Sequence, residues 1–211
     1  MAAVSGGKDS LAMLWLLQDR LKRVPISYRI TAVHIDPGFG ADSAGQMEAF
    51  LSSHGFDHRI IRSDFGPLAH RSESTGNACF ICSRLRRNTL FRLAKEMGCN
   101  KIAFGHHKDD IIETFFLNIF YGASISTMTP VQAFFNGRLH IIRPLFMVDE
   151  DLIWRYAHSM GWPEIQLGCP SAGSSKREEV RVMLDRFYSS SEKIKGNVFH
   201  ALQNVRQEYL L

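Results

Sequence analysis

The sequence lacks the features that define several common protein classes. Its 211 residues contain only four cysteines and show neither an internal repeat nor a low-complexity tract. Four cysteines in a chain of this length do not suggest the disulfide framework of a small secreted domain. The charged fraction is 22% and the hydrophobic fraction is 45%. Both values are ordinary for a globular protein, which excludes wholesale disorder and collagen-like or coiled-coil architectures.

A long uninterrupted hydrophobic run is also missing. The longest stretch without Asp, Glu, Lys or Arg covers residues 114–137, but polar residues and breakers such as Asn118 and Pro130 interrupt it. A membrane-spanning helix needs predominantly apolar residues, so we reject that interpretation. Lys8 and Asp9 break the apolar start, which argues against a signal peptide. We therefore expect a soluble, cytoplasmic protein without a membrane partner.

Strand-like and helix-like segments alternate along the first part of the chain. Segments rich in β-branched or apolar residues predict strands, and apolar residues at helical spacing between them predict helices. The predicted strands are 1–4, 30–35, 56–61 and 101–104. This alternation predicts an α/β fold, a Rossmann-like parallel sheet flanked by helices with right-handed crossovers.

The pattern changes beyond residue 130. Residues 131–142 predict a hairpin that turns at Asn136-Gly137. The segments expected to be helical are 150–161, 175–188 and 192–208, and residues 63–78 are expected to form a loop. We therefore divide the chain into a core domain, residues 1–145, and a small C-terminal helical extension, residues 146–211.

A glycine-containing loop separates the first strand from the first helix. Its sequence is Ser5-Gly6-Gly7-Lys8-Asp9-Ser10. The glycines let backbone amides approach an anion, the helix N-terminus adds partial positive charge, and Lys8 can neutralise a phosphate. This is not a Walker loop, which has four residues between its glycines. The six residues resemble the signature of the PP-loop ATP pyrophosphatases. The resemblance implies that Ser5 to Ser10 bind ATP, that Lys8 and Asp9 act in catalysis, and that ATP is cleaved between its α- and β-phosphates.

Two further segments follow predicted strands and reach the same edge of the sheet, where ligands of open α/β sheets bind. Asp36 ends one strand, and Gly105-His106-His107-Lys108-Asp109-Asp110 follows another. Carboxylates beside a nucleotide can hold Mg²⁺, although Asp110 could instead cap the following helix. The resemblance implies that Gly105, His106 and Asp109 contact ATP, and we assign Asp36 to the same site and Asp110 to catalysis.

Cys79 and Cys82 are three residues apart at the start of a predicted helix, where thiolates are favoured. Cys169 lies in a turn-like segment, whereas Cys99 between a helix stop and a strand is expected to be a packed thiol. Three cysteine ligands suit a 4Fe–4S cluster with one open iron, and four suit structural zinc. Spacing alone leaves these two alternatives nearly even.

The sequence around these cysteines is similar to that of the TtcA-type tRNA 2-thiocytidine synthetases. The similarity rests on Cys-x-x-Cys-Ser-Arg-Leu-Arg-Arg, on Gly-His-His-x-Asp-Asp-Ile and on Ile142-Arg143-Pro144-Leu145, and it extends from residue 1 to about residue 185. It implies that Cys79, Cys82 and Cys169 hold a 4Fe–4S cluster and take part in catalysis. It further implies that the enzyme replaces the C2 oxygen of an anticodon-loop cytidine in tRNA with sulfur.

Basic residues form two groups, although the formal net charge is only +4. They crowd the helix after Cys82 and recur near the C-terminus, where they indicate either a solvated face or contacts to tRNA phosphates. We assign to tRNA binding Arg84, Arg86, Arg87, Lys176, Arg177 and Arg181. The expected partners are tRNA, a sulfur donor such as a cysteine desulfurase, and a second copy of the chain in a homodimer. The alternatives are a PP-loop enzyme with another substrate and a non-catalytic nucleotide- or zinc-binding module.

Overall fold

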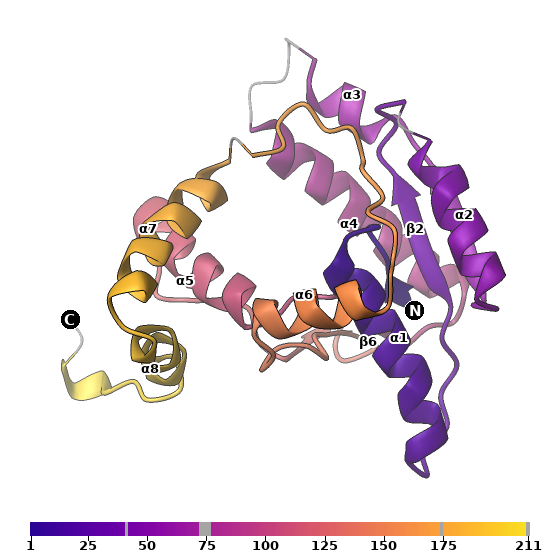
Figure 1. The fold of residues 1–211 in the computed structure, drawn as a ribbon. Coiled ribbons are helices and arrows are strands. Elements are labelled where there is room, and N and C mark those ends of the chain that lie inside the picture. The colour runs from indigo at the N-terminus through magenta and orange to yellow at the C-terminus, as the bar shows by residue number, and fades with distance from the viewer. Residues whose placement is uncertain (41, 72–76, 174, 210–211) are drawn as a thin grey trace. The chain divides into compact units, whose positions relative to one another are not determined.

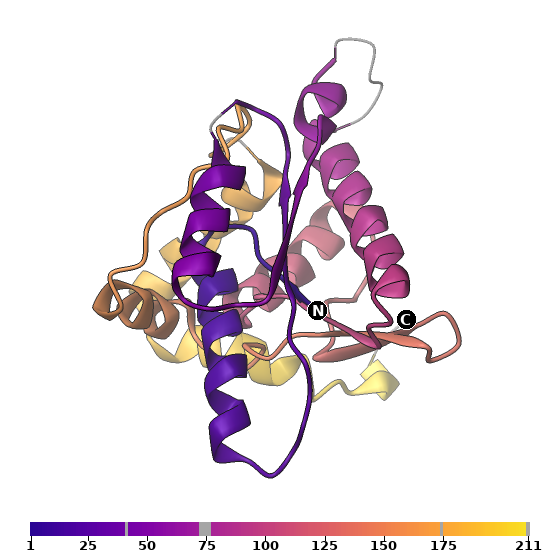
Figure 2. The ribbon, with the colours of Figure 1, turned by 90° about the vertical axis from the view of Figure 1, so that its right-hand side faces the viewer.

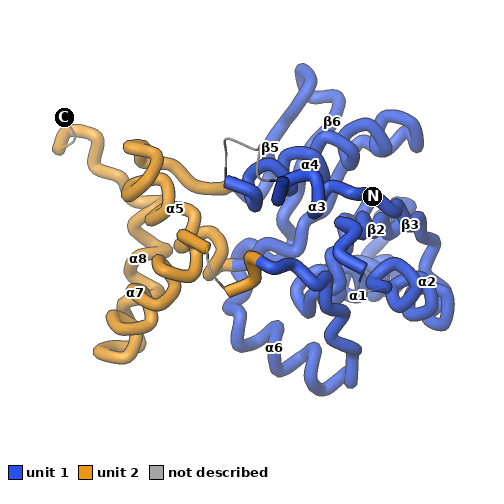
Figure 3. Tube along the Cα trace, turned by 90° about the horizontal axis from the view of Figure 1, so that it is seen from above, with its two compact units in different colours: residues 1–107, 129–170 blue, residues 108–128, 171–211 orange. Residues whose placement is uncertain are grey.

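A computed structural model describes residues 1–40, 42–71, 77–173 and 175–209 (Figure 1). The chain divides into two compact units (Figure 3). The first unit contains residues 1–107 and 129–170, and the second contains residues 108–128 and 171–211. The two predicted domains, divided at residue 145, are each one continuous stretch of sequence. The two units of the structure are not, because the chain leaves the first unit at residue 108 and returns to it at residue 129.

The first unit is built on one sheet with the strand order β3–β2–β1–β4–β6–β5. Its strands are β1 (Ala2–Ala3), β2 (Ala32–Asp36), β3 (His58–Arg62), β4 (Lys101–Ala103), β5 (Val131–Phe134) and β6 (Leu139–Ile142). The neighbouring strands β3, β2, β1, β4 and β6 are parallel, and the edge strand β5 pairs antiparallel with β6. This confirms the predicted parallel sheet, and β5 and β6 form the predicted hairpin.

Helices cover both faces of the sheet (Figure 2). They are α1 (Lys8–Arg23), α2 (Ser43–Ser53), α3 (Phe65–Ala69), α4 (Ala78–Glu96) and α6 (Glu150–Ser159). Successive strand residues point to opposite faces. Accordingly Ala32 packs with Leu11, Met47 and other residues of α1, α2 and α6, whereas the next residue, Val33, packs with Leu93 and other residues of α4. The sheet is therefore the middle layer between two apolar cores.

The second unit is helical. It consists of α5 (Lys108–Gly122), α7 (Lys176–Ser190), α8 (Lys193–Ala201) and the short 3₁₀ helix η1 (Gln207–Tyr209). The helices α5, α7 and α8 pack against one another. Their buried apolar side chains include Ile112 of α5, Leu184 of α7 and Phe199 of α8.

Two predicted segments differ from the structure. The expected loop 63–78 contains α3, a five-residue helix with Pro67 in its first turn, where proline is tolerated; residues 72–76 of that segment lie outside the described residues. The expected helix 192–208 ends at Ala201. Within the described part of the chain, every helix is too short or too polar to cross a membrane.

Candidate active site

The loop Ser5–Ser10 connects β1 to α1 and is fixed by its own hydroxyl groups. The Ser10 hydroxyl accepts the backbone N–H of Ser5 at 3.1 Å and donates to the carbonyl of Gly7 at 2.8 Å. Gly6 has φ of +99°, and a Cβ added there would lie 3.1 Å from Cβ of Ile165. The glycine is therefore required by both conformation and space. In this structure Ser10 shapes the loop, because its proton is already donated to Gly7.

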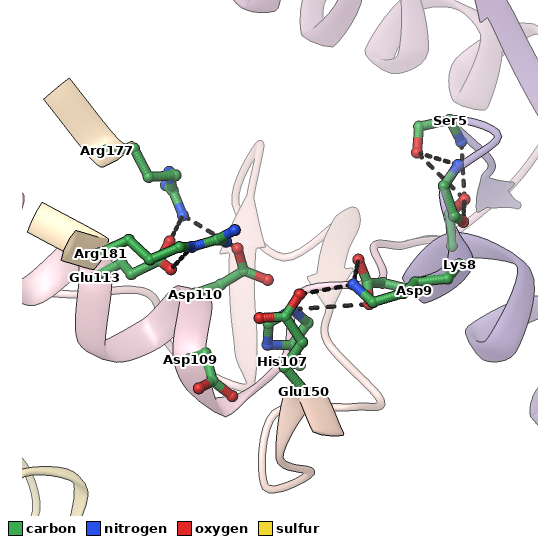
Figure 4. Close-up of polar contacts among 12 residues, drawn as sticks. Ser5, Lys8, Asp9, His107, Asp109, Asp110, Glu113, Glu150, Arg177 and Arg181 are labelled. Atoms are coloured by element: carbon green, nitrogen blue, oxygen red, sulfur yellow. Dashed lines mark hydrogen bonds and ion pairs between the residues drawn. The ribbon is translucent and has the colours of Figure 1, made fainter. Parts of the chain in front are cut away.

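Lys8 extends from the start of α1 into a cluster of acidic groups (Figure 4). Its Nζ lies 2.7 Å from Oε1 of Glu150 and 3.0 Å from Oδ1 of Asp9. Burial opposes the charge of Lys8, but the hydrogen bonds to Glu150 and Asp9 and the charges of these two carboxylates together outweigh burial and raise the Lys8 pKa. Lys8 is therefore a fixed cation at the base of the loop.

The same cluster contains His107, which lies in the predicted segment 105–110 but had no assigned role, and Glu150, which sequence reasoning missed. Nε2 of His107 lies 3.7 Å from Oδ1 of Asp9, and the His107 side chain is buried. One ligand atom from each of Asp9, His107 and Glu150 lies within 4.8 Å of the other two. Two carboxylates and an imidazole are a donor set that can hold a divalent cation. Glu150 begins α6, 142 residues beyond Lys8, so only the fold could reveal it.

The loop after β4 touches the loop after β1. A Cβ added at Gly105 would lie 2.8 Å from the carbonyl carbon of Asp9, so the two segments meet backbone to backbone. His106 follows, and its Nδ1 accepts a hydrogen bond from Nε of Arg143 at 3.3 Å. Asp36 ends β2, and its Oδ1 accepts the backbone N–H of Gly38 at 2.9 Å. The first unit thus brings Gly105 together with the loop Ser5–Ser10, as predicted from the position of both segments after parallel strands.

The thiols of Cys79, Cys82 and Cys169 all belong to the first unit, and all four cysteines of the chain are free. Burial raises the pKa of the Cys82 thiol, Arg86 opposes this shift, and the nearby Cys169 and Cys79 add to it. Cys79 and Cys169 therefore each lie near enough to Cys82 to affect its charge.

Cys99 lies beyond the other end of α4. Its backbone N–H donates to the carbonyl of Ala94, and its side chain packs against the core on the α4 side of the sheet. The 19 residues of α4 correspond to a helix about 28 Å long, which separates Cys99 from Cys79.

The predicted acidic residues Asp109 and Asp110 lie in the second unit, in the first turn of α5. Asp109 forms an ion pair with Lys195, and Asp110 lies 3.1 Å from Nη1 of Arg177. These carboxylates are therefore bound to cations of α7 and α8.

Glu113 of α5 is a third carboxylate of the second unit, one that sequence reasoning missed. Its carboxylate contacts Arg177 at 3.0 Å and Arg181 at 2.9 Å, and its side chain is 4% exposed (Figure 4). Burial raises the Glu113 pKa, while Arg181 and Arg177 oppose the shift. The spacing of Glu113 to Asp110 on one face of α5 was the available signal.

The basic residues assigned to tRNA differ in their surroundings. Arg84 and Arg87 on α4 are exposed, whereas Arg86 is half-buried and its charge acts on Cys82 and Cys169. In the second unit, Lys176 pairs with Glu179 at 2.8 Å and lies over the ring of Tyr121.

Comparisons with known proteins identify the family of the chain. Residues 1–164 match the family model of the PP-loop domain. The fold and the loop after β1 therefore define a PP-loop protein, as the six-residue motif predicted.

Two relatives identify the family within the PP-loop proteins more specifically. The chain is 41% identical to the tRNA-cytidine(32) 2-sulfurtransferase of Alkalilimnicola ehrlichii over all of its own length and 68% of that protein. It is 37% identical to the tRNA-cytidine(32) 2-sulfurtransferase of Syntrophotalea carbinolica over 99% of its length and 82% of that protein. The chain belongs to the tRNA-cytidine(32) 2-sulfurtransferase family, which confirms the predicted resemblance.

Two solved structures share the fold. The U34-tRNA thiolase NcsA from Methanococcus maripaludis, solved with its [4Fe-4S] cluster, matches with a TM-score of 0.77 and 24% identity, over 99% of this chain and 71% of its own. The phosphoadenylyl-sulfate reductase from Candida auris matches with a TM-score of 0.50 and 12% identity, over 79% of this chain and 76% of its own. At these identities the matches concern the fold.

Proposed function

We propose that the protein is an ATP-dependent tRNA sulfurtransferase that replaces the C2 oxygen of an anticodon-loop cytidine, the cytidine 32 of its relatives' names, with sulfur. The C2 oxygen attacks the α-phosphorus of ATP, and pyrophosphate leaves. Sulfur at the oxidation level of sulfide then attacks C2, and the oxygen leaves with AMP. The chemistry requires a fixed anion site for pyrophosphate and a place where sulfur is presented close to it.

One observation supports this proposal: Cys79 and Cys169, from two distant segments, each affect the charge of Cys82, and all three belong to the same unit as the loop Ser5–Ser10. The N–H of Cys79 is capped by Asn77 at 2.9 Å at the start of α4, where the helix dipole favours thiolates. Mutual repulsion of neighbouring thiolates is relieved by a bound metal. These residues fit a 4Fe–4S cluster, which, when bound by three cysteines, offers one iron without a protein ligand for presenting sulfur.

The other residues have roles in binding and orientation. The glycines of the loop expose backbone N–H groups to pyrophosphate, and Lys8 neutralises the charge that develops there. Asp9, His107 and Glu150 form the donor set that would hold Mg²⁺ arriving with ATP. Since Lys8 now bridges Asp9 and Glu150, we expect its Nζ to turn toward the phosphates when the metal binds. Ser5, Asp36 and His106 line the same sheet edge and are proposed to contact the nucleotide.

The proposal includes partners that follow from this chemistry. Arg84 and Arg87 are exposed on α4 and are proposed to contact tRNA phosphates. The predicted tRNA contacts of the second unit remain predictions; they are Lys176, Arg177 and Arg181. The assignment of Asp109 and Asp110 to the ATP site also remains a prediction. A cysteine desulfurase as sulfur donor, a homodimer and a cytoplasmic location also remain predictions.

The test is a thiolation assay on protein purified and reconstituted with iron and sulfide without oxygen. We expect about four irons per chain and ATP-dependent formation of 2-thiocytidine in a tRNA transcript, detected by mass spectrometry. The variants C79A, C82A and C169A should each lose iron and product, and C99A is the matched control that should keep both. A protein that needs Cys99 for metal, or that binds one zinc through four cysteines, contradicts the proposal.

A further inference from the structure

Arg143 is a buried cation directly after β6. Arg143 is 8% exposed. A buried charge is usually paired with an opposite charge. Its Nε donates to Nδ1 of His106 at 3.3 Å, and its Nη1 donates to the carbonyl of Thr129. An accepting imidazole nitrogen and a peptide carbonyl are neutral, so these contacts orient the guanidinium and leave its charge uncompensated.

A second arginine lies close to it. Burial lowers the pKa of Arg143, and the charge of Arg87 lowers it further, so the two cations lie near enough to repel each other. Within the described ranges, neither guanidinium forms an ion pair with a carboxylate. Two neighbouring arginines without a counter-charge, one of them held in place, are an arrangement that suits an anion.

The location of Arg143 also points to a ligand. β6 runs parallel to β4, and β4 runs parallel to β1. Arg143 therefore follows its strand at the same edge of the sheet as the loop Ser5–Ser10, which follows β1. Ligands of open parallel sheets bind outside this edge. Arg87 lies on α4, the helix that also carries Cys79 and Cys82.

We propose that Arg143 and Arg87 form a phosphate-binding site, with Arg143 oriented by His106 and Thr129. The planar guanidinium of Arg143 can offer two parallel N–H donors to a phosphate, and the exposed Arg87 can close on it from the solvent side. The phosphate belongs either to the backbone of the RNA substrate or to the pyrophosphate part of ATP. This inference rests on the proposed function, because that function names RNA and ATP as the two sources of phosphate.

The experiment measures both sources separately on the full-length protein. Affinity for a tRNA transcript is measured by filter binding at several salt concentrations, and affinity for ATP and for inorganic pyrophosphate by calorimetry. The variants are R143Q and R87Q, with R92Q as the matched control, since Arg92 is an exposed arginine on the same helix that pairs with Glu96 at 2.7 Å. Thermal unfolding establishes that each variant is folded; R87Q, which changes an exposed side chain, keeps the test valid if R143Q is unstable.

We expect R143Q and R87Q to lose about tenfold or more in affinity for one of the two sources, which is the size of one charge-assisted hydrogen bond. If the source is RNA, the dependence of log K on log salt becomes shallower by about one phosphate contact, and ATP affinity is unchanged. If the source is ATP, pyrophosphate affinity falls and the RNA salt dependence stays. Unchanged affinity for both sources in folded R87Q and R143Q overturns the proposal. A wild-type protein that binds phosphate through Arg143 but makes no 2-thiocytidine contradicts the proposed function and leaves this site standing.

Discussion

Arginines of the two units have opposite surroundings. In the second unit, Arg177 and Arg181 converge on the buried carboxylate of Glu113. In the first unit, Arg143 is buried against neutral acceptors, and Arg87 is exposed beside it. The same residue type therefore serves packing among helices in one unit and remains available for an anion in the other.

This difference changes how basic residues should be interpreted. A cluster of arginines in a sequence predicts phosphate contacts more strongly where the fold leaves their charge uncompensated. The side chains of Arg177 and Arg181 are 37% and 39% exposed, so burial alone does not explain why their charge is unavailable to another anion. Their carboxylate partner does.

The largest expected effect comes from breaking the ion pairs of the second unit. The substitution Arg181→Met leaves the buried Glu113 with only Arg177, so the free energy of unfolding should fall by about 2–3 kcal/mol. The matched change Arg87→Met removes a cation without a carboxylate partner and should stay within about 0.5 kcal/mol. Urea denaturation followed by circular dichroism measures both. Equal losses would show that the contrast between the units has no energetic basis.

The next effect concerns the contact between two loops of the first unit. The substitution Gly105→Ala places a Cβ 2.8 Å from the Asp9 carbonyl carbon, and rigid backbone must shift to accept it. We expect a loss of about 1–3 kcal/mol in the free energy of unfolding, together with weaker ATP binding, because the shift displaces Asp9. Calorimetric ATP titration of the folded variant checks the second part. Normal ATP affinity would mean that the loop after β4 does not position Asp9.

The sequence predicted the parts of this molecule that depend on local pattern. Strand and helix alternation placed the loop Ser5–Ser10, Asp36 and Gly105 at one sheet edge, and the Asn136-Gly137 turn placed the hairpin. In the structure Phe135, Asn136 and Gly137 all have positive φ, as a tight hairpin turn requires.

Long-range partners could not be predicted in this way. Glu150 meets Lys8 across 142 residues, and Glu113 meets Arg181 across 68. In neither case does local spacing identify the partner. Glu113 shares a face of α5 with Asp110, but both Glu113 and Glu150 also look like ordinary acidic positions of an exposed helix face. The position of α5 in the second unit was also missed. The sequence of α5 continues directly from the loop after β4, and its partners α7 and α8 are distant in sequence.

A smaller effect is expected from the buried His34 of β2. Its Nδ1 lies 2.9 Å from the carbonyl of Val4, and burial lowers its pKa below the ordinary 6.5. Above pH 6.5 the ring is neutral in the folded and unfolded chain alike. Below it the unfolded chain takes up a proton that the folded chain resists, so stability is lost as pH falls, by up to about 1.4 kcal/mol per pH unit.

Urea midpoints at pH 7.5, 6.5, 6.0 and 5.5 measure this contribution in wild type and in H34Q. The variant should lose the part of the slope that begins near pH 6.5, whatever its absolute stability. An identical slope in both proteins would assign the acid sensitivity to other groups.

The smallest effect compares two glycines that both face open space, one in each unit. Gly196 lies inside α8, and Gly161 follows α6 with φ of +62°; an added Cβ would meet nothing within 4 Å at either position. Only the backbone conformation distinguishes them. Gly196→Ala should raise the free energy of unfolding by about 0.5–1 kcal/mol, because alanine restricts the unfolded chain and suits a helix. Gly161→Ala should lower it by about 1 kcal/mol, because a Cβ is strained in the left-handed region. Urea denaturation of both variants gives the signs directly. A loss at Gly196 would mean that this glycine is needed for something other than the helix, and would make the exposed face of α8 the next place to look for a partner of the second unit.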